Sequence, residues 1–161
     1  MRGRLFDVGA AGLHRLDPLI VHVASADELT PLVERVPDAA RVLIERFWPG
    51  PLSIVLPKRP LVPDIVTSGL PSVTVRCPSR SIAKKWIETA GVPIAARSAN
   101  LFCSVGPTTA QHVAEQFGDQ LSIILDGGPC NVGVESSVVS FLHDRPMLLR
   151  PAESLRKTSR D

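Results

Sequence analysis

The chain has 161 residues, a formal net charge of +2 at pH 7, 44% apolar residues and 21% charged residues. This length suits one domain with one sizeable core, and the composition excludes a disordered chain, a collagen and a coiled coil. The charge is too small to indicate a nucleic-acid-binding protein by itself.

The first third of the chain predicts two strands separated by two helices. Ser25 and Glu28 form a capping-box pattern that begins the first helix. Pro49-Gly50-Pro51 ends the second helix. In chain order, the predicted elements are a strand at 19–23, a helix at 26–36, a helix at 39–48 that follows Asp38, and a strand at 52–56.

The middle third continues this alternation after residues 57–71, whose four prolines and one glycine predict a long irregular loop. Gly91 and Gly118 are predicted to end its two helices. The elements are a strand at 72–76, a helix from Ser79 or Ser81 to Ala90, a strand at 93–96, a polar loop at 97–107, and a helix from Thr108 or Thr109 to Phe117.

The last third predicts a strand at 122–125, a glycine loop at 126–129, and a hairpin of residues 136–142 and 147–149. Because strands and helices mix throughout, we expect an α/β (α+β) fold with a twisted mixed sheet and flanking helices. The expected organisation is an atypical N-terminus at 1–16 without regular elements, a domain at 17–152 and a polar tail at 153–161.

The three cysteines, Cys77, Cys103 and Cys130, are widely spaced and form no CxxC or Cys/His ligand motif. We therefore expect no protein-bound metal. The odd cysteine count and the lack of an apolar signal region predict a cytoplasmic protein. The apolar runs are too short to span a membrane.

Two loops are candidates for binding an anion. Ser98 and Asn100 follow a predicted buried strand, which is where α/β sheets place ligands. In the second loop, Gly128 and Gly133 would let backbone amides approach a negative group closely. Ordinary turn chemistry is the simpler alternative for both loops, because serine, asparagine and glycine all favour turns.

Arg76 and Arg150 each end a predicted strand. A buried arginine at a strand end needs an anionic partner, which is either a protein carboxylate or a ligand. His22 lies in an apolar run, where a hydrogen-bonded core histidine is the usual interpretation. No GxSxG or HExxH motif indicates a serine hydrolase or a catalytic zinc.

Six stretches resemble, in order, the motifs of one family over residues 17–152. They are Pro18-Leu19-Ile20-Val21-His22 (PLIVH), Phe47-Trp48-Pro49-Gly50-Pro51-Leu52 (FWPGPLT), Thr74-Val75-Arg76-Cys77-Pro78 (TVRxP), Ser98-Ala99-Asn100 with Pro107-Thr108-Thr109-Ala110 (SANxSGxxSPTTA), residues 126–139 (DGGPxxxGxESTVVD) and Leu149-Arg150-Pro151 (LRPG). The chain thus resembles the YrdC-like threonylcarbamoyl-AMP synthases, the family of TsaC, YrdC and YciO.

The resemblance implies a mixed sheet around a concave basic cleft, and an enzyme that converts ATP, L-threonine and bicarbonate to threonylcarbamoyl-AMP and pyrophosphate. The product serves t6A formation at position 37 of tRNA, so tRNA or double-stranded RNA and threonylcarbamoyl-transferase proteins are implied partners. Mg²⁺ is expected with the triphosphate. By position, Ser98, Asn100 and Arg150 would bind the nucleotide, His22, Arg76 and Ser136 would bind threonine, and Gly128 and Gly133 would shape the loop.

The sequence also departs from the family pattern. The PTxTxYGL motif is absent, and Ala11-Gly12-Leu13-His14 stands where counting back from Pro18 places the family's KGRP. Leu101-Phe102-Cys103 alters the SANxSG loop. The resemblance implies that the lysine and arginine of KGRP hold the ATP phosphates, and this chain lacks both at those positions. The loss of these charge-assisted contacts predicts much weaker ATP binding. A catalytically impaired homologue therefore remains one alternative. An RNA-binding module, using basic pairs such as Lys84-Lys85, is another.

Overall fold

The computed structural model describes residues 6–7, 18–99, 106–130 and 136–151. Within these ranges, seven strands form one mixed sheet in the order β1-β5-β2-β4-β3-β6-β7. The strands are β1 (Phe6–Asp7), β2 (Ile20–His22), β3 (Leu52–Pro57), β4 (Ser72–Arg76), β5 (Ile94–Ala96), β6 (Ser137–Ser140) and β7 (Met147–Arg150). The α/β fold with a mixed sheet is therefore confirmed.

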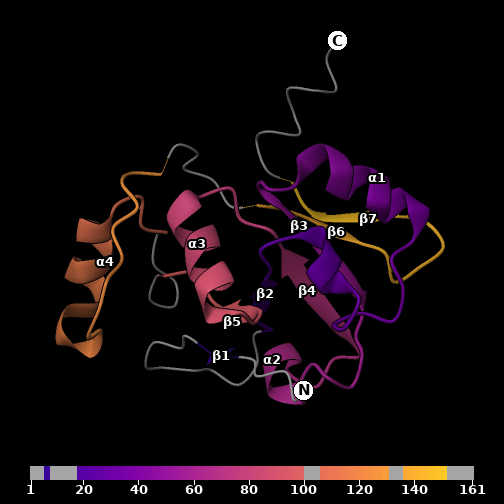
Figure 1. The fold of residues 1–161 in the computed structure, drawn as a ribbon, viewed down its shortest axis with the longest axis horizontal. Coiled ribbons are helices and arrows are strands. Elements are labelled where there is room, and N and C mark those ends of the chain that lie inside the picture. Colours follow the sequence, from indigo (N-terminus) through magenta and orange to yellow (C-terminus); the bar gives the residue numbers. More distant parts are fainter. Residues whose placement is uncertain (1–5, 8–17, 100–105, 131–135, 152–161) are drawn as a thin grey trace, which may run out of the picture.

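Among the described residues, four α-helices accompany this sheet, and Figure 1 shows the fourth on the far side of the third, away from the strands. They are α1 (Asp38–Phe47), α2 (Asp64–Thr67), α3 (Ser81–Ala90) and α4 (Ala110–Phe117), with short 3₁₀ turns η1 (Ala26–Leu29) and η2 (Gly118–Gln120). Figure 1 shows α1 beside β3, β6 and β7, and α3 beside β5. Gly91 ends α3 with a φ of 65°, as the sequence predicts, because glycine adopts this left-handed conformation without strain.

The core lies where the central strands meet α1. Strand β3 is buried over nearly its whole length because it is apolar and pairs on both sides, antiparallel to β4 and parallel to β6. Val21, Ile54 and Val75 are fully buried on three adjacent strands. Helix α1 covers this layer with Ala40 and Ile44, which lie four residues apart and so share one helix face.

The predicted helix at 26–36 is wrong beyond its first turn, because only η1 forms. Pro31 lacks the backbone N–H that an α-helix needs and disfavours helical conformation in the residue before it. The predicted capping box is not formed, because the Glu28 carboxylate accepts a hydrogen bond at 3.0 Å from the N–H of Ala24, one residue before the predicted cap, and not from Ser25. The side chain of Ser25 caps nothing.

The predicted strand at 122–125 is also wrong. These residues pair with none of the described strands, and Ile123 remains 79% exposed. The apolar run therefore has no ladder partner within the described ranges. Two elements were not predicted: α2 within the proline-rich loop at 57–71, and β1, which pairs in parallel with β5.

Candidate functional site

The two candidate arginines and His22 come together because their strands end at one edge of the sheet. Strands β2 and β4 are parallel, and their last residues, His22 and Arg76, are paired in register. Strand β7 ends at Arg150, beside the beginning of β6. Strand β3 links the two groups, because Ser53 pairs with Arg76 on one side and with Val138 on the other.

These strand ends enclose a pocket of about 310 Å³. Its lining includes five of the residues singled out from the sequence, together with Arg97 and three apolar or proline residues: Pro18, Ile20, His22, Arg76, Ala96, Arg97, Ser98, Ser136 and Arg150. Three arginines and no carboxylate line it among the described residues. A low-dielectric hollow with this charge attracts anions.

Arg150 is oriented by Ser136. Its Nε donates to the Ser136 carbonyl oxygen at 3.0 Å, and its Nη2 donates to the Ser136 hydroxyl at 3.2 Å. The hydroxyls of Ser136 and Ser53 lie 2.9 Å apart, and both residues are buried. A planar guanidinium held by two bonds in this way is fixed in direction, which suits recognition of a phosphate or carboxylate.

Arg76 is held by the turn that follows α1. Its Nε donates to the Gly50 carbonyl oxygen at 3.2 Å. Burial, and then the nearby charge of Arg150, lower the pKa of Arg76. Two guanidinium groups that repel each other inside a pocket are a cost to the empty protein, and a bound anion would offset that cost.

His22 is neutral in this setting. Burial, and then the Arg76 charge, lower its pKa from 6.5 to about 4. The His22 Nδ1 lies 3.1 Å from the Ile20 carbonyl oxygen. Because a carbonyl oxygen only accepts, Nδ1 carries the hydrogen. His22 is thus both the hydrogen-bonded histidine expected from its apolar run and a wall of the pocket.

The glycine loop at 126–129 lies apart from the pocket lining. Gly128 has a φ of 79°, and its N–H donates to the Asp126 carboxylate at 2.7 Å. The Arg80 guanidinium donates to the carbonyl oxygens of Gly127 and Pro129, which attaches this loop to the start of α3. Two further candidates, Asn100 and Gly133, lie outside the described residues.

Sequence reasoning missed Ser53, Gly50 and Arg97 as parts of the site. Ser53 stands where the FWPGPLT motif has its threonine, and this position was the available signal. Its partner Ser136 is 83 positions away, so the sequence does not show which side chain it contacts. Arg97 directly follows β5, and this position at a strand end was the available signal.

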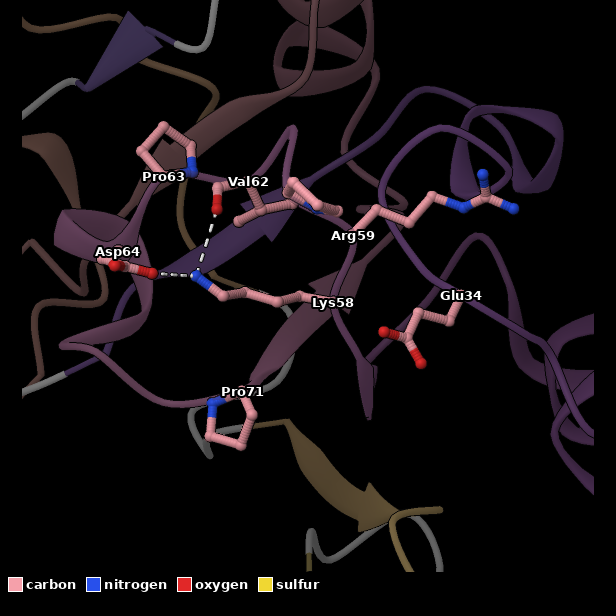
Figure 2. Close-up of a pocket in the computed structure, with 8 residues that line it drawn as sticks. Glu34, Lys58, Arg59, Val62, Pro63, Asp64 and Pro71 are labelled. Atoms are coloured by element: carbon pink, nitrogen blue, oxygen red, sulfur yellow. Dashed lines mark hydrogen bonds and ion pairs between the residues drawn. The ribbon is translucent and has the colours of Figure 1, made fainter.

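A second cavity, of about 460 Å³, lies at the other end of β3 (Figure 2). Two cations and two carboxylates line it. The Lys58 ammonium donates to the Asp64 carboxylate at 2.5 Å and to the Val62 carbonyl oxygen at 3.1 Å, as the dashed lines show. Its charges compensate one another, so it lacks the net attraction for anions of the arginine-lined pocket.

Among the described residues, no group of His, Cys, Asp and Glu side chains is placed to hold a metal ion. No helix in the same ranges is long and apolar enough to cross a membrane.

Comparison with protein families gives a match to the Sua5, YciO and YrdC model, described as telomere recombination, over residues 11–152. The chain is 47% identical over 148 residues to the threonylcarbamoyl-AMP synthase of Pyrococcus abyssi, covering 92% of this chain and 43% of that protein. It is 45% identical over 136 residues to the enzyme of the same name from Bacillus subtilis, covering 84% and 39%. The chain thus spans less than half the length of these relatives.

Solved structures give the same result. The crystal structure of P. abyssi Sua5 complexed with L-threonine matches with a TM-score of 0.86 at 45% identity, over 92% of this chain and 45% of that one. Escherichia coli YciO matches with a TM-score of 0.77 at 21% identity, over 88% and 68%, which supports the fold alone.

Proposed function

The chain belongs to the Sua5, YciO and YrdC family, and from that premise we propose that its arginine-lined pocket binds the substrates of a threonylcarbamoyl-AMP synthase. The proposed reaction joins L-threonine, bicarbonate and ATP to give threonylcarbamoyl-AMP, pyrophosphate and water. The product would serve t6A modification of tRNA. Relatives that cover this chain at 45–47% identity carry the name of that enzyme.

The observation that carries the proposal is the charge of the pocket. Arg76, Arg97 and Arg150 line one hollow, and its described lining residues include no carboxylate. All three substrates bring negative groups: the triphosphate of ATP, the carboxylate of threonine and bicarbonate. Placing cations and hydroxyl donors where these groups meet lowers their mutual repulsion, which is the main obstacle to the reaction.

The residues divide between the two larger substrates. On the threonine side we place His22, Arg76 and Ser136, and on the nucleotide side Ser98, Asn100 and Arg150. The amine nitrogen of threonine would first form a bond to the carbon of bicarbonate, and water would leave, giving N-carboxythreonine. A carboxylate oxygen of its new carbamate group would then attack the α-phosphorus, and the bond from that phosphorus to the pyrophosphate oxygen would break. Positioning and charge stabilisation suffice for this step, so no side chain needs to act as a covalent nucleophile.

Mg²⁺ would enter with the triphosphate as part of the substrate, because the described pocket lining has no carboxylate to bind it. Gly128 and Gly133 would shape the loop that precedes Ser136 in the chain. tRNA, double-stranded RNA and the proteins that use the adenylate are proposed partners, and the cytoplasm is the proposed location.

Pyrophosphate release tests the proposal. Purified chain is incubated with ATP and Mg²⁺, and release is measured with threonine and bicarbonate present, with each omitted in turn, and with serine or alanine in place of threonine. Release that requires both threonine and bicarbonate is expected. Pyrophosphate release without threonine contradicts the proposal. The proposal is also contradicted if no pyrophosphate is released and calorimetry detects no binding of ATP or threonine.

The altered sequence at positions 11–14 and 101–103 favours a second candidate, a homologue that binds the substrates but turns over slowly. Calorimetry separates the two. Threonine binding without pyrophosphate release identifies the impaired form. An RNA-binding module would instead shift tRNA in a gel in a strongly salt-dependent manner without binding threonine.

A further inference from the structure

The hydroxyls of Ser53 and Ser136 form a buried pair that the proposed reaction does not by itself require. Their oxygens lie 2.9 Å apart, on residues that are 0% and 4% exposed. Ser136 lines the arginine pocket, whereas Ser53 does not. Ser53 lies on central strand β3, between the partners Arg76 and Val138, so its backbone position is fixed on both sides.

Either hydroxyl of this pair can donate the hydrogen bond, and the choice determines whether Ser136 can donate one to a ligand. The Arg150 Nη2 donates to the Ser136 oxygen at 3.2 Å, so that oxygen already accepts one hydrogen bond. If Ser53 also donates to it, the hydrogen of Ser136 is available to the pocket. If Ser136 donates to Ser53 instead, it has no hydrogen left for a ligand.

We propose that Ser53 is a positioning residue that holds the Ser136 hydroxyl as a hydrogen-bond donor into the pocket. The three arginines make this pocket attractive to anions, and an anionic oxygen accepts hydrogen bonds from donors. This inference rests on the proposed function, in which Ser136 lies on the threonine side of the pocket. Ser53 itself touches no ligand, so its whole effect on binding passes through Ser136.

A double-mutant cycle tests whether Ser53 affects binding through Ser136. L-threonine is titrated calorimetrically into wild type, Ser53→Ala, Ser136→Ala and the double variant, all with ATP and Mg²⁺ present. Inorganic pyrophosphate is titrated in parallel as a second anionic probe. Ser53→Ala is expected to weaken threonine binding about fivefold, the effect of one lost neutral hydrogen bond. In the Ser136→Ala background, the same change is expected to leave the affinity unaltered.

Two further variants separate positioning from packing. Ser53→Thr keeps the hydroxyl and is expected to bind threonine within about twofold of wild type. Ser140→Ala removes another buried serine hydroxyl, on β6 and outside the pocket lining, and is expected to leave the affinity unchanged. Thermal unfolding of each variant shows whether stability alone has changed.

The outcomes are distinct. Equal weakening by Ser53→Ala in both backgrounds, or none in either, overturns the role of Ser53 while leaving the proposed function intact. Wild type that binds pyrophosphate but not threonine overturns the proposed function, and the same cycle measured with pyrophosphate then decides whether Ser53 acts through Ser136. Wild type that binds neither probe overturns both.

Discussion

The guanidinium of Arg76 donates from Nε to the carbonyl oxygen of Gly50 at 3.2 Å. The N–H of Gly50 in turn donates to the Cys77 carbonyl oxygen at 2.9 Å. The Pro49-Gly50-Pro51 turn is therefore joined twice to the end of β4. The turn that ends α1 also aims one of the two strand-end arginines at the pocket.

Gly50→Ala is expected to damage both stability and binding. A Cβ at this position would overlap the carbonyl oxygen of Phe47, so the turn would have to move and Arg76 with it. Overpacking of this kind costs about 1–3 kcal/mol. Urea unfolding measures the loss of stability, and calorimetry measures the loss of threonine affinity.

Gly106→Ala is the matched control, because a Cβ at Gly106 would meet nothing within 4 Å. It is expected to leave stability within about 0.5 kcal/mol of wild type. A Gly50→Ala variant as stable as the Gly106→Ala variant would contradict the steric argument.

Arg150→Lys is expected to weaken ATP binding about tenfold although the charge is kept. Lysine has no planar fork, so it cannot donate to both the carbonyl oxygen and the hydroxyl of Ser136 while facing a ligand. Arg41→Lys, on the exposed face of α1, is the control and should bind ATP as wild type does. Equal ATP affinity of Arg150→Lys and wild type would show that charge alone matters at this position.

Local sequence predicted the strands well where apolar runs lie between prolines. Residues 52–56 and 72–76 are of this kind, and both are strands in the sheet. The same local rule was wrong for residues 122–125, because forming a strand also requires a partner edge, and no run of residues contains that information. The capping-box pattern at 25–28 marked where a helical turn begins, but Pro31 prevented the predicted helix at 26–36 from continuing beyond that turn.

The sequence predicted several residues of the candidate site but not how the fold brings them together. Arg76 and Arg150 could be chosen because a cation at a strand end is conspicuous in the sequence. Their meeting depends on β3 pairing with both β4 and β6 and on β7 pairing with β6, and the β3–β6 pairing joins segments far apart in the sequence. Ser53 was not chosen although it stands at the threonine position of the FWPGPLT motif, because only the fold brings its hydroxyl to that of Ser136.

Asp64→Asn is expected to lower stability by about 1 kcal/mol without changing the affinity for threonine or ATP. Asp64 is the anionic partner of Lys58, whose side chain is 11% exposed. The loss is small because the Asp64 side chain itself is largely in solvent. Reduced ligand affinity in this variant would contradict the assignment of the binding site to the other end of β3.

The stability of the protein is expected to fall as the pH is lowered from about 6.5 to about 4, partly because of His22. Its folded-state pKa of about 4 lies below the ordinary value of 6.5, so the unfolded chain binds a proton more readily than the native one. The contribution is complete above pH 6.5 and is lost as the pH falls through the folded-state pKa. Its size is up to about 3 kcal/mol.

His22→Asn isolates this contribution, because asparagine keeps an N–H donor for the Ile20 carbonyl oxygen but does not titrate. Urea unfolding of both proteins is measured at intervals from pH 7 to pH 4. The carboxylates titrate alike in the two proteins, so the difference between the two curves reports His22. Wild type is expected to lose more stability than His22→Asn across this range. Parallel curves would mean that His22 takes up its proton as easily in the folded protein as in the unfolded chain.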